Sequence, residues 1–328
     1  MEPILTDTNR HSVEPRDNKY SLIWDCYQTQ INSFWPASKI IFTDDRKQYP
    51  LLSDIERNIT DNVLGFFSIG DELIMENLNS NFIEEIKIPE IITMLRWQNS
   101  IEDIHSQVYN KNVLEVYPLE KDRNRVFNLV KDSEILERKI DFAKKYMDVS
   151  VPFNIRIVAF TLYEGVGFSG SFAWIDWLKL KNYKLTGMFH HNDYISNDEF
   201  NHTLGGSLIE SHIINKASDK VVKECMMELQ NIEIDFWKNL IPQYGLSNGM
   251  SIDNMILHIK HCTNICANML NRPKLLYDND TSTPFKFLKS RSLSTKYNFF
   301  EQEGINYRMG STKNVPVSDS SFNLEGDF

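Results

Sequence analysis

Apolar residues recur at three- and four-residue steps along almost the whole chain, and this helical period constrains the fold more than any other feature. No segment alternates polar and apolar residues as a β-strand does, with turn signals on both sides. Long helices joined by short connections are typical of a helical bundle. We therefore predict an all-α fold with helices over residues 52–79, 88–110, 119–147, 152–181, 191–215, 218–241 and 251–270.

Composition excludes several classes of protein and partner. The chain has 328 residues, of which 41% are hydrophobic and 24% charged, as in an ordinary globular protein. Its net charge of −10 argues against binding to nucleic acid or to an anionic membrane. Four cysteines are too few for a disulfide framework, and the polar N-terminal sequence lacks the apolar core of a signal peptide. We expect a reducing, cytoplasmic setting.

One apolar stretch, residues 157–178, has the length of a membrane span. Glu164 and Asp176 interrupt it, and a charge in hydrocarbon is costly. We predict a buried core helix with an inward-facing carboxylate. The glycines at 165, 167 and 170 lack the context of a phosphate-binding loop, and we expect them to allow close helix packing or a local distortion near Glu164.

The two ends of the chain differ from the helical body. Residues 1–18 are polar, and we expect them to be flexible; residues 19–309 should form one helical domain. Residues 310–328 are rich in Ser, Asn, Asp and Gly and are expected to form a flexible tail, because they offer little apolar surface to bury. The last apolar residues, Phe322, Leu324 and Phe328, suit a peptide that becomes ordered on a partner, although an inert tail also fits this composition.

Two Glu-x-x-His pairs offer metal ligands. They are Glu102 with His105 and Glu199 with His202. Residues three apart lie on the same face of a helix, so each pair presents a carboxylate and an imidazole to one point. One such pair alone is weak evidence, because the spacing arises by chance.

An acidic residue on an apolar helix precedes each pair. Asp71 lies 102 − 71 = 31 residues before Glu102, and Glu164 lies 199 − 164 = 35 residues before Glu199. Carboxylates in apolar helices are rarely left without a partner. Four carboxylates and two imidazoles from four helices form the metal site of ferritin-like di-iron and di-manganese proteins. Such oxygen and imidazole ligands favour iron or manganese over zinc or copper(I). We predict a ferritin-like helical bundle with a di-metal carboxylate site.

Aromatic and apolar residues surround the predicted ligands. Tyr109 follows His105 by four residues and therefore lies on the same helical face. The same spacing places Phe168, Phe172 and Ile195 beside the second set of ligands. A phenol in such a pocket could be oxidised and then protected from reductants. On spacing alone, however, a core tyrosine with a hydrogen-bonded hydroxyl explains Tyr109 better.

Two other groups of histidines could be mistaken for metal sites. His258, His261 and Cys262 match no standard zinc spacing and lie in a helical region, so we interpret them as ordinary core or surface residues. His190 and His191 could bind a metal adventitiously, but we predict that they are solvated loop residues.

Several strings of residues resemble the small, radical-bearing subunit of class I ribonucleotide reductase. The likeness runs in order from about residue 20 to residue 328 and is closest to the eukaryotic and large-DNA-virus branch. The motifs are specific because order, spacing and the C-terminal sequence agree. They are SFW at 33–35, FFSIGDELIMENL, SIEDIHSQVY, YEGVGFSGSFAWIDWLK, ISNDEFNH, KYNFFE, YRMG and the terminal FNLEGDF.

This resemblance implies a ferritin-like fold and two iron ions per chain, with manganese as the alternative. One ion would be held by Asp71, Glu102 and His105, and the other by Glu164, Glu199 and His202. The protein would act as the small subunit of ribonucleoside-diphosphate reductase, an oxidoreductase that converts ribonucleotides to deoxyribonucleotides. It would form a homodimer and would be active only with a large subunit.

The resemblance also assigns a radical site and a transfer route. Tyr109 would hold a tyrosyl radical in a pocket lined by Phe168, Phe172 and Ile195. Trp35 and Asp198 match the family's electron-transfer relay, with Asp198 hydrogen-bonded to the far side of His105. Tyr307 resembles the tail tyrosine that passes the oxidation onward, and the terminal residues ending at Phe328 resemble the peptide that docks on the large subunit.

Two alternatives remain open. One is a ferritin-like di-iron oxygenase or desaturase that acts on its own small substrate. The other is an accessory paralogue of the small subunit that carries no radical and supports a partner subunit. An oxygenase or desaturase would not need the Trp35–Asp198 pair or a docking tail. Loss of the ligands or of Tyr109 would have favoured the accessory paralogue, and all of these residues are present.

Overall fold

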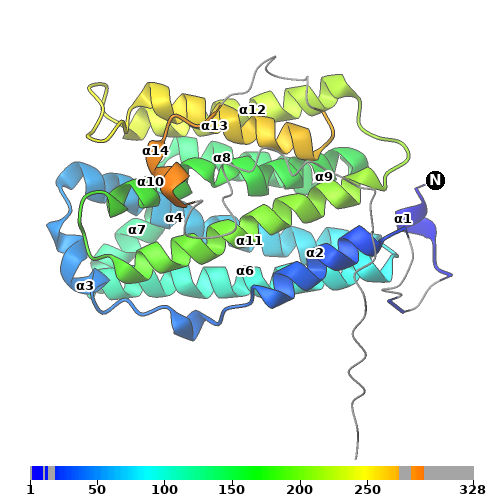
Figure 1. Ribbon diagram of the computed structural model, residues 1–328, viewed down its shortest axis with the longest axis horizontal. Helices are drawn as coiled ribbons and strands as arrows, with labels where there is room; N and C mark the ends of the chain where they lie inside the picture. Colours follow the sequence, from blue (N-terminus) through cyan, green and yellow to red (C-terminus); the bar gives the residue numbers. More distant parts are fainter. Residues whose placement is uncertain (1, 10–11, 14–18, 273–281, 292–328) are drawn as a thin grey trace, which may run out of the picture.

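In a computed structural model, the described residues (2–9, 12–13, 19–272 and 282–291) form a bundle of helices without a β-strand, which confirms the predicted all-α fold for this part of the chain. The long helices share roughly one axis (Figure 1). They are α2 (Ser21–Asn32), α4 (Asp54–Asn77), α6 (Pro89–Val116), α7 (Glu120–Asp132), α8 (Glu134–Met147), α9 (Phe153–Leu162), α10 (Ser169–Lys179), α11 (Thr186–Ser211), α12 (Asp219–Leu240) and α13 (Ile252–Met269). Shorter helices are α1 (Pro3–Thr6), α3 (Asp45–Gln48), α5 (Ile83–Glu85) and α14 (Lys286–Arg291).

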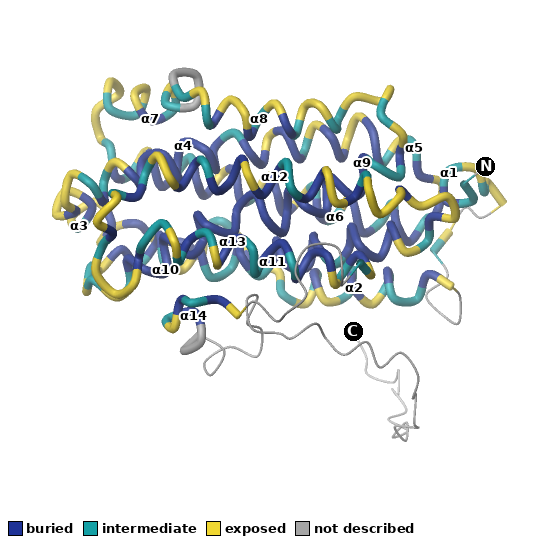
Figure 2. The backbone as a smooth tube through the Cα atoms, turned by 90° about the horizontal axis from the view of Figure 1, so that it is seen from above, coloured by how far each residue is buried: buried dark blue, intermediate teal, exposed yellow. Residues whose placement is uncertain are grey.

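The centre of the bundle is formed by α4, α6, α9, α10 and α11. Helix α4 packs on α6, and α11 packs on α6, α9 and α10. Helix α2 covers the groove between α6 and α11, whereas α8, α12 and α13 cover α9 and α10 from the other side. The middle portions of these helices are buried and their outer faces are exposed (Figure 2). The apolar core is therefore continuous along the bundle axis.

Side chains fix where two central helices begin. At the start of α4, the Ser53 hydroxyl accepts a hydrogen bond from the Glu56 backbone N–H, and the Glu56 carboxylate accepts one from the Ser53 N–H at 2.9 Å. This capping box satisfies two N–H groups that the helix leaves unpaired. At the start of α11, the buried Asp45 carboxylate accepts the N–H groups of Gly187 and Met188 at 2.8 and 2.7 Å. The negative charge also suits the positive end of the helix dipole.

Each predicted range overlaps a helix of the structure, but several bounds differ. The single helix predicted over 119–147 is wrong, because Ser133 is extended and its hydroxyl accepts the N–H of Leu136 at 3.4 Å, which begins a new helix. The range 152–181 contains α9 and α10, separated by a π-helical turn at Tyr163–Gly167. Helix α11 begins at Thr186 rather than at 191, and α2 was not among the predicted helices.

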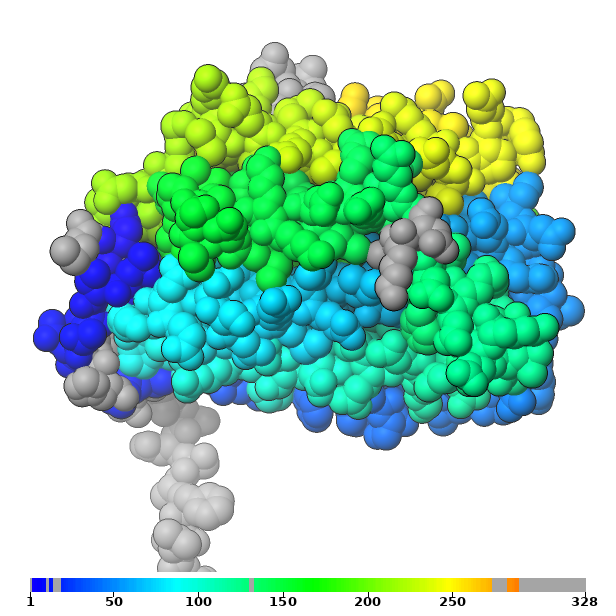
Figure 3. Space-filling view, turned by 180° about the vertical axis from the view of Figure 1, so that it is seen from behind, coloured from blue at the N-terminus to red at the C-terminus, as the bar shows by residue number. Residues whose placement is uncertain are grey.

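The N-terminal residues contact the bundle. Ile4 is buried, and its carbonyl accepts the Lys87 N–H at 2.8 Å. The Glu2 carboxylate accepts the Ile214 N–H at 2.8 Å, just beyond the end of α11. Figure 3 shows this segment, in dark blue, at one end of the molecule. The described part of 1–18 therefore contacts the bundle, whereas we expected a flexible terminus. Ile4 is buried, and the Glu2 carboxylate binds the backbone just beyond the end of α11.

The apolar stretch 157–178 is buried throughout, as predicted. No helix among the described residues is both long enough and apolar enough to cross a membrane. The expected close packing is present at two of its glycines. A Cβ atom at Gly165 would clash with Thr203 and Cys266, and one at Gly170 would clash with the indole of Trp237. These positions require glycine because neighbouring helices approach the backbone directly.

We predict that Gly170→Ala lowers the free energy of unfolding by about 1–3 kcal/mol, because the added methyl group overpacks a rigid contact. The Trp237 indole cannot move easily, since it donates a hydrogen bond to Glu233 at 2.9 Å. Urea unfolding followed by circular dichroism measures the change. Gly205→Ala is the matched control: its Cβ would lie 3.1 Å from the flexible end of the Met94 side chain and in ordinary contact with Cys26 Sγ at 3.9 Å, so stability should not fall. Equal losses in both variants would contradict this account.

Candidate metal centre

Six ionisable side chains from four helical segments meet inside the bundle. Each is no more than 1% exposed. Their ligand atoms form two overlapping groups, and within each group the atoms lie within 4.8 Å of one another. The structure therefore brings together all six predicted ligands: Asp71 from α4, Glu102 and His105 from α6, Glu164 from the π-helical turn, and Glu199 and His202 from α11.

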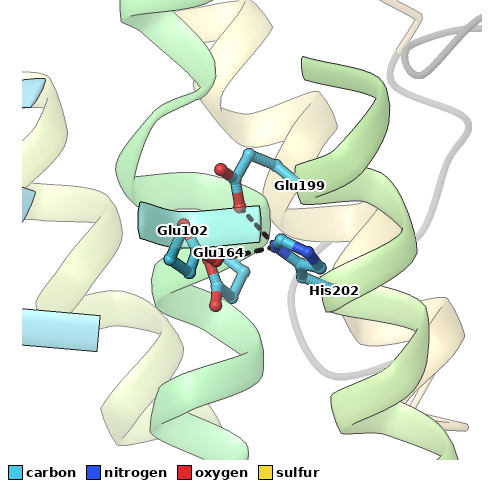
Figure 4. A group of neighbouring side chains, drawn as sticks. All are labelled: Glu102, Glu164, Glu199 and His202. Atoms are coloured by element: carbon cyan, nitrogen blue, oxygen red, sulfur yellow. Dashed lines mark hydrogen bonds and ion pairs between the residues drawn. The ribbon is translucent and has the colours of Figure 1, made fainter. Parts of the chain in front are cut away.

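Two carboxylates lie between the two imidazoles. Nδ1 of His202 is 2.9 Å from Oε1 of Glu102 and 3.1 Å from Oε2 of Glu199. Nδ1 of His105 is 3.1 Å from the other oxygen of Glu102 and 3.2 Å from the other oxygen of Glu199. Figure 4 shows Glu102 from α6, Glu164 from the π-helical turn, and Glu199 and His202 from α11 converging on one point. Glu102 and Glu199 thus lie in bridging positions between the two imidazoles.

The cluster concentrates negative charge where water is excluded. Burial raises the pKa of Asp71 well above its ordinary value, and the Glu102 carboxylate raises it further. Burial and the charge of Glu199 act in the same way on the pKa of Glu164. Burial alone would lower the pKa of His202, but the adjacent Glu102 and Glu199 raise it to about 10. Positive charge at this point would relieve the repulsion between the carboxylates.

Three carboxylate oxygens in the cluster are buried and have no hydrogen bond within the described part of the chain: Oδ2 of Asp71, Oε1 of Glu102 and Oε2 of Glu164. Oε1 of Glu102 lies against the His202 imidazole, as described above. The other oxygen of Glu164 accepts a hydrogen bond from Gln98 at 2.8 Å. Gln98 was missed by sequence reasoning, although its position four residues before Glu102 places it on the same face of α6. Buried carboxylate oxygens without a donor are expected to bind a cation.

The donor set fits a pair of iron or manganese ions. All six ligands supply carboxylate oxygen or imidazole nitrogen, which both metals accept. The charge, the unpartnered oxygens and the bridging positions agree with this assignment. The residues present therefore fit the centre that the sequence predicted.

The predicted relay residues form a continuous path from the cluster. Nε1 of Trp35 donates a hydrogen bond to Oδ2 of Asp198 at 2.8 Å, and the same oxygen is 3.1 Å from Nε2 of His105. The Trp35 ring stacks on His105, with centroids 5.9 Å apart, and on Tyr194, at 5.3 Å. Asp198 thus orients a ligand imidazole while it holds the indole.

Tyr109 lies in an aromatic pocket beside the cluster. It is 1% exposed and stacks on Phe67, with centroids 4.4 Å apart. Phe168 and Phe172 pack against the same Phe67 ring, at 5.9 and 5.5 Å, and Ile195 is fully buried on α11. Sequence reasoning missed Phe67, whose position four residues before Asp71 could have indicated it. Burial and the charge of the Asp71 carboxylate raise the pKa of the Tyr109 phenol well above its ordinary value.

The His191 imidazole also borders this pocket, and its burial shows that one prediction was wrong. His191 is not a solvated loop residue: it lies on α11 and is fully buried, whereas His190 is exposed. Its ring meets that of Tyr109 edge-on, at 5.3 Å and 90°. Asn112 lies 2.8 Å from Nε2 of His191. The prediction failed because α11 begins one and a half turns earlier than its apolar pattern indicated. Tyr307 and Phe328 lie outside the described residues.

Comparison with known proteins agrees with this geometry. A family model described as ribonucleotide reductase, small chain, matches residues 15–284. The ribonucleoside-diphosphate reductase subunit M2 of Danio rerio is 32% identical over all of this chain and 83% of its own length. The ribonucleoside-diphosphate reductase small chain of Yaba-like disease virus is also 32% identical, over all of this chain and 98% of its own.

Solved structures share the fold. A ribonucleotide reductase R2 subunit from Clostridium botulinum superposes with a TM-score of 0.76 and 26% identity, over 85% of this chain and 90% of that chain. The ribonucleotide reductase Rnr4 homodimer of Saccharomyces cerevisiae gives a TM-score of 0.76 and 23% identity, over 89% of this chain and 91% of that chain. With the family model covering most of its length, this chain belongs to the ribonucleotide reductase small-chain family.

Proposed function

We propose that this protein is the small subunit of a ribonucleoside-diphosphate reductase, in which an oxidising equivalent is stored at Tyr109 and passed to a large subunit. The observation that carries the proposal is the connection between three parts. The Trp35–Asp198–His105 path ends at the six-residue cluster, and the buried Tyr109 phenol lies one turn after His105 on the same helix. A radical-bearing small subunit would need all three for radical generation, storage and transfer.

We propose that two iron ions occupy the cluster, with manganese as the alternative. Asp71, Glu102 and His105 would hold one ion, and Glu164, Glu199 and His202 the other. When bound, the metal pair supplies the activation of O2 that makes oxidation of a phenol possible. The protein holds the ligands rigidly because they come from packed helices, and Gln98 and Asp198 orient Glu164 and His105 from behind.

The residues around Tyr109 control the fate of its proton and of the oxidised ring. A phenol that loses an electron also releases its hydroxyl proton, and the product is a neutral radical. The Asp71 carboxylate, whose charge acts on this phenol, suits the role of proton acceptor. The surrounding Phe67, Phe168 and Phe172 exclude water and soluble reductants.

Transfer to a partner would follow the path that begins at His105. Trp35 is 2% exposed, and its neighbour Tyr194 is partly exposed, so the path leads from the cluster towards the surface. We propose that Tyr307 continues it and that the tail ending at Phe328 docks on the large subunit. We also propose a homodimer in the cytoplasm; a relative of the same fold is described as a homodimer.

Metal binding should stabilise the protein strongly. We expect the chelated protein to gain thermal stability when Mn²⁺, or Fe²⁺ without oxygen, is added, because a ligand at 100 times its Kd contributes about 2.7 kcal/mol to the folded state. Elemental analysis should give two ions per chain. Glu102→Gln should lower that number, whereas Glu210→Gln, a buried carboxylate on α11 paired with Lys216, should not. A wild-type protein that binds no metal would contradict the proposed centre.

Tyr109→Phe should abolish a radical that forms in the wild type. The iron-loaded protein is exposed to oxygen, and low-temperature electron paramagnetic resonance should show a tyrosyl signal, because the pocket isolates the oxidised phenol. Tyr163→Phe is a matched control, since Tyr163 is another buried tyrosine and directly precedes Glu164. A signal that survives in Tyr109→Phe and disappears in Tyr163→Phe would show that the radical forms on Tyr163, contrary to the proposal.

Deletion of residues 322–328 should separate a reductase subunit from a self-contained oxygenase. The shortened protein should keep the Tyr109 radical at the wild-type level, because the pocket is intact. With added large subunit, its reduction of ribonucleoside diphosphates should fall by at least about tenfold, which corresponds to 1.4 kcal/mol of lost binding. Unchanged reductase activity would refute the docking role of the tail.

A further inference from the structure

Two buried polar atoms beside Tyr109 lack a hydrogen bond. Within the described part of the chain, Nδ1 of His191 and Oδ1 of Asn112 are buried and have no such partner. Buried polar groups are nearly always paired, so two unpartnered atoms in one pocket require an explanation. None of the assigned metal, relay or docking roles uses His191 or Asn112.

The contacts of His191 fix which of its nitrogens can donate. The Asn112 side-chain amide donates to Nε2 of His191 at 2.8 Å, so Nε2 is the acceptor. Burial, followed by the positive charge of His105, lowers the pKa of His191 to about 3, which leaves a neutral imidazole at physiological pH. A neutral imidazole carries one hydrogen, and here that hydrogen lies on Nδ1. His191 therefore holds a buried N–H donor that still needs an acceptor.

The phenol of Tyr109 is the matching group. The two rings are perpendicular with centroids 5.3 Å apart, and the Phe42 ring also packs against the imidazole, with centroids 5.9 Å apart. Tyr109 and Asn112 are three residues apart on α6, so they share the face that meets His191 on α11. Asn112 thus anchors the imidazole from the same helix that carries the phenol.

We propose that the Nδ1–H group of His191, held in place by Asn112, donates a hydrogen bond to the oxygen of Tyr109, either directly or through one bound water molecule. His191 is then a positioning residue for the radical. A phenoxyl oxygen remains an acceptor after its proton has left, so the donor serves both oxidation states. The significance of this contact for radical chemistry rests on the proposed function, but the contact itself does not.

The radical state provides the first test. In oxygen-treated, iron-loaded protein, electron–nuclear double resonance in H2O and D2O should detect one exchangeable proton coupled to the Tyr109 radical. His191→Phe should abolish that coupling, His191→Gln should restore a coupling through its amide donor, and His190→Phe, at the exposed neighbour, should leave it unchanged. A coupling that persists in a folded His191→Phe protein, or that is absent from a wild-type radical, would overturn the proposal.

The metal-free protein provides a second test that does not need a radical. With 15N-labelled histidine, magnetic resonance should show His191 neutral and protonated on Nδ1 between about pH 6 and pH 8. Tyr109→Phe should shift the His191 Nδ1 resonance, because its acceptor is lost, while the His258 resonances stay in place. An unchanged Nδ1 resonance would refute the hydrogen bond. If the wild type forms no radical, the proposed function fails, and this measurement alone decides the role of His191.

Discussion

The burial of four carboxylates and two imidazoles at one point is the constraint on which the rest of the structure depends. Like charges this close repel strongly when water is excluded, and no folded chain keeps such a cluster without compensation. The compensation has three sources: the imidazoles themselves, polar groups such as Gln98 that orient the carboxylates, and the cations that the donor set fits. Packed helices are needed because only a rigid frame can hold six ligands against their own repulsion.

Buried polar contacts reinforce the helical frame around the π-helical turn that carries Glu164. Glu164 lies in a π-helical turn, and the carbonyl of Gly167 at the end of that turn accepts a hydrogen bond from Lys139 at 2.9 Å. Lys139 is fully buried and pairs with Glu233 at 2.6 Å, and Glu233 also holds the indole that packs on Gly170. A buried ion pair is costly to form but restricts geometry. We infer that α8 and α12 fix the turn, and with it the position of one ligand.

The clustering of the six predicted side chains could be foreseen from sequence because they follow helical spacing and stand out as charges in apolar helices. The Glu-x-x-His pairs, Asp71 and Glu164 all met this criterion. The interruptions could not be predicted in the same way. A π-helical turn keeps the apolar composition of its helix, and the Ser133 hydroxyl begins a new helix inside a continuous helical pattern. The burial of His191 was also not predicted, because burial in a pocket depends on tertiary packing that no local pattern records.

The two halves of the cluster resemble each other in sequence but differ in their connections. On the first half, His105 contacts Asp198, Asp198 holds Trp35, and Tyr109 follows one turn later on the same helix. On the second half, Glu164 is carried by a braced π-helical turn and oriented by Gln98. The Tyr109 phenol and the Trp35–Asp198 pair therefore both adjoin the half of the cluster that contains His105. An oxidising equivalent stored at Tyr109, as proposed, would lie close to the path by which it would leave, and the opposite half would be free to hold a metal ion rigidly.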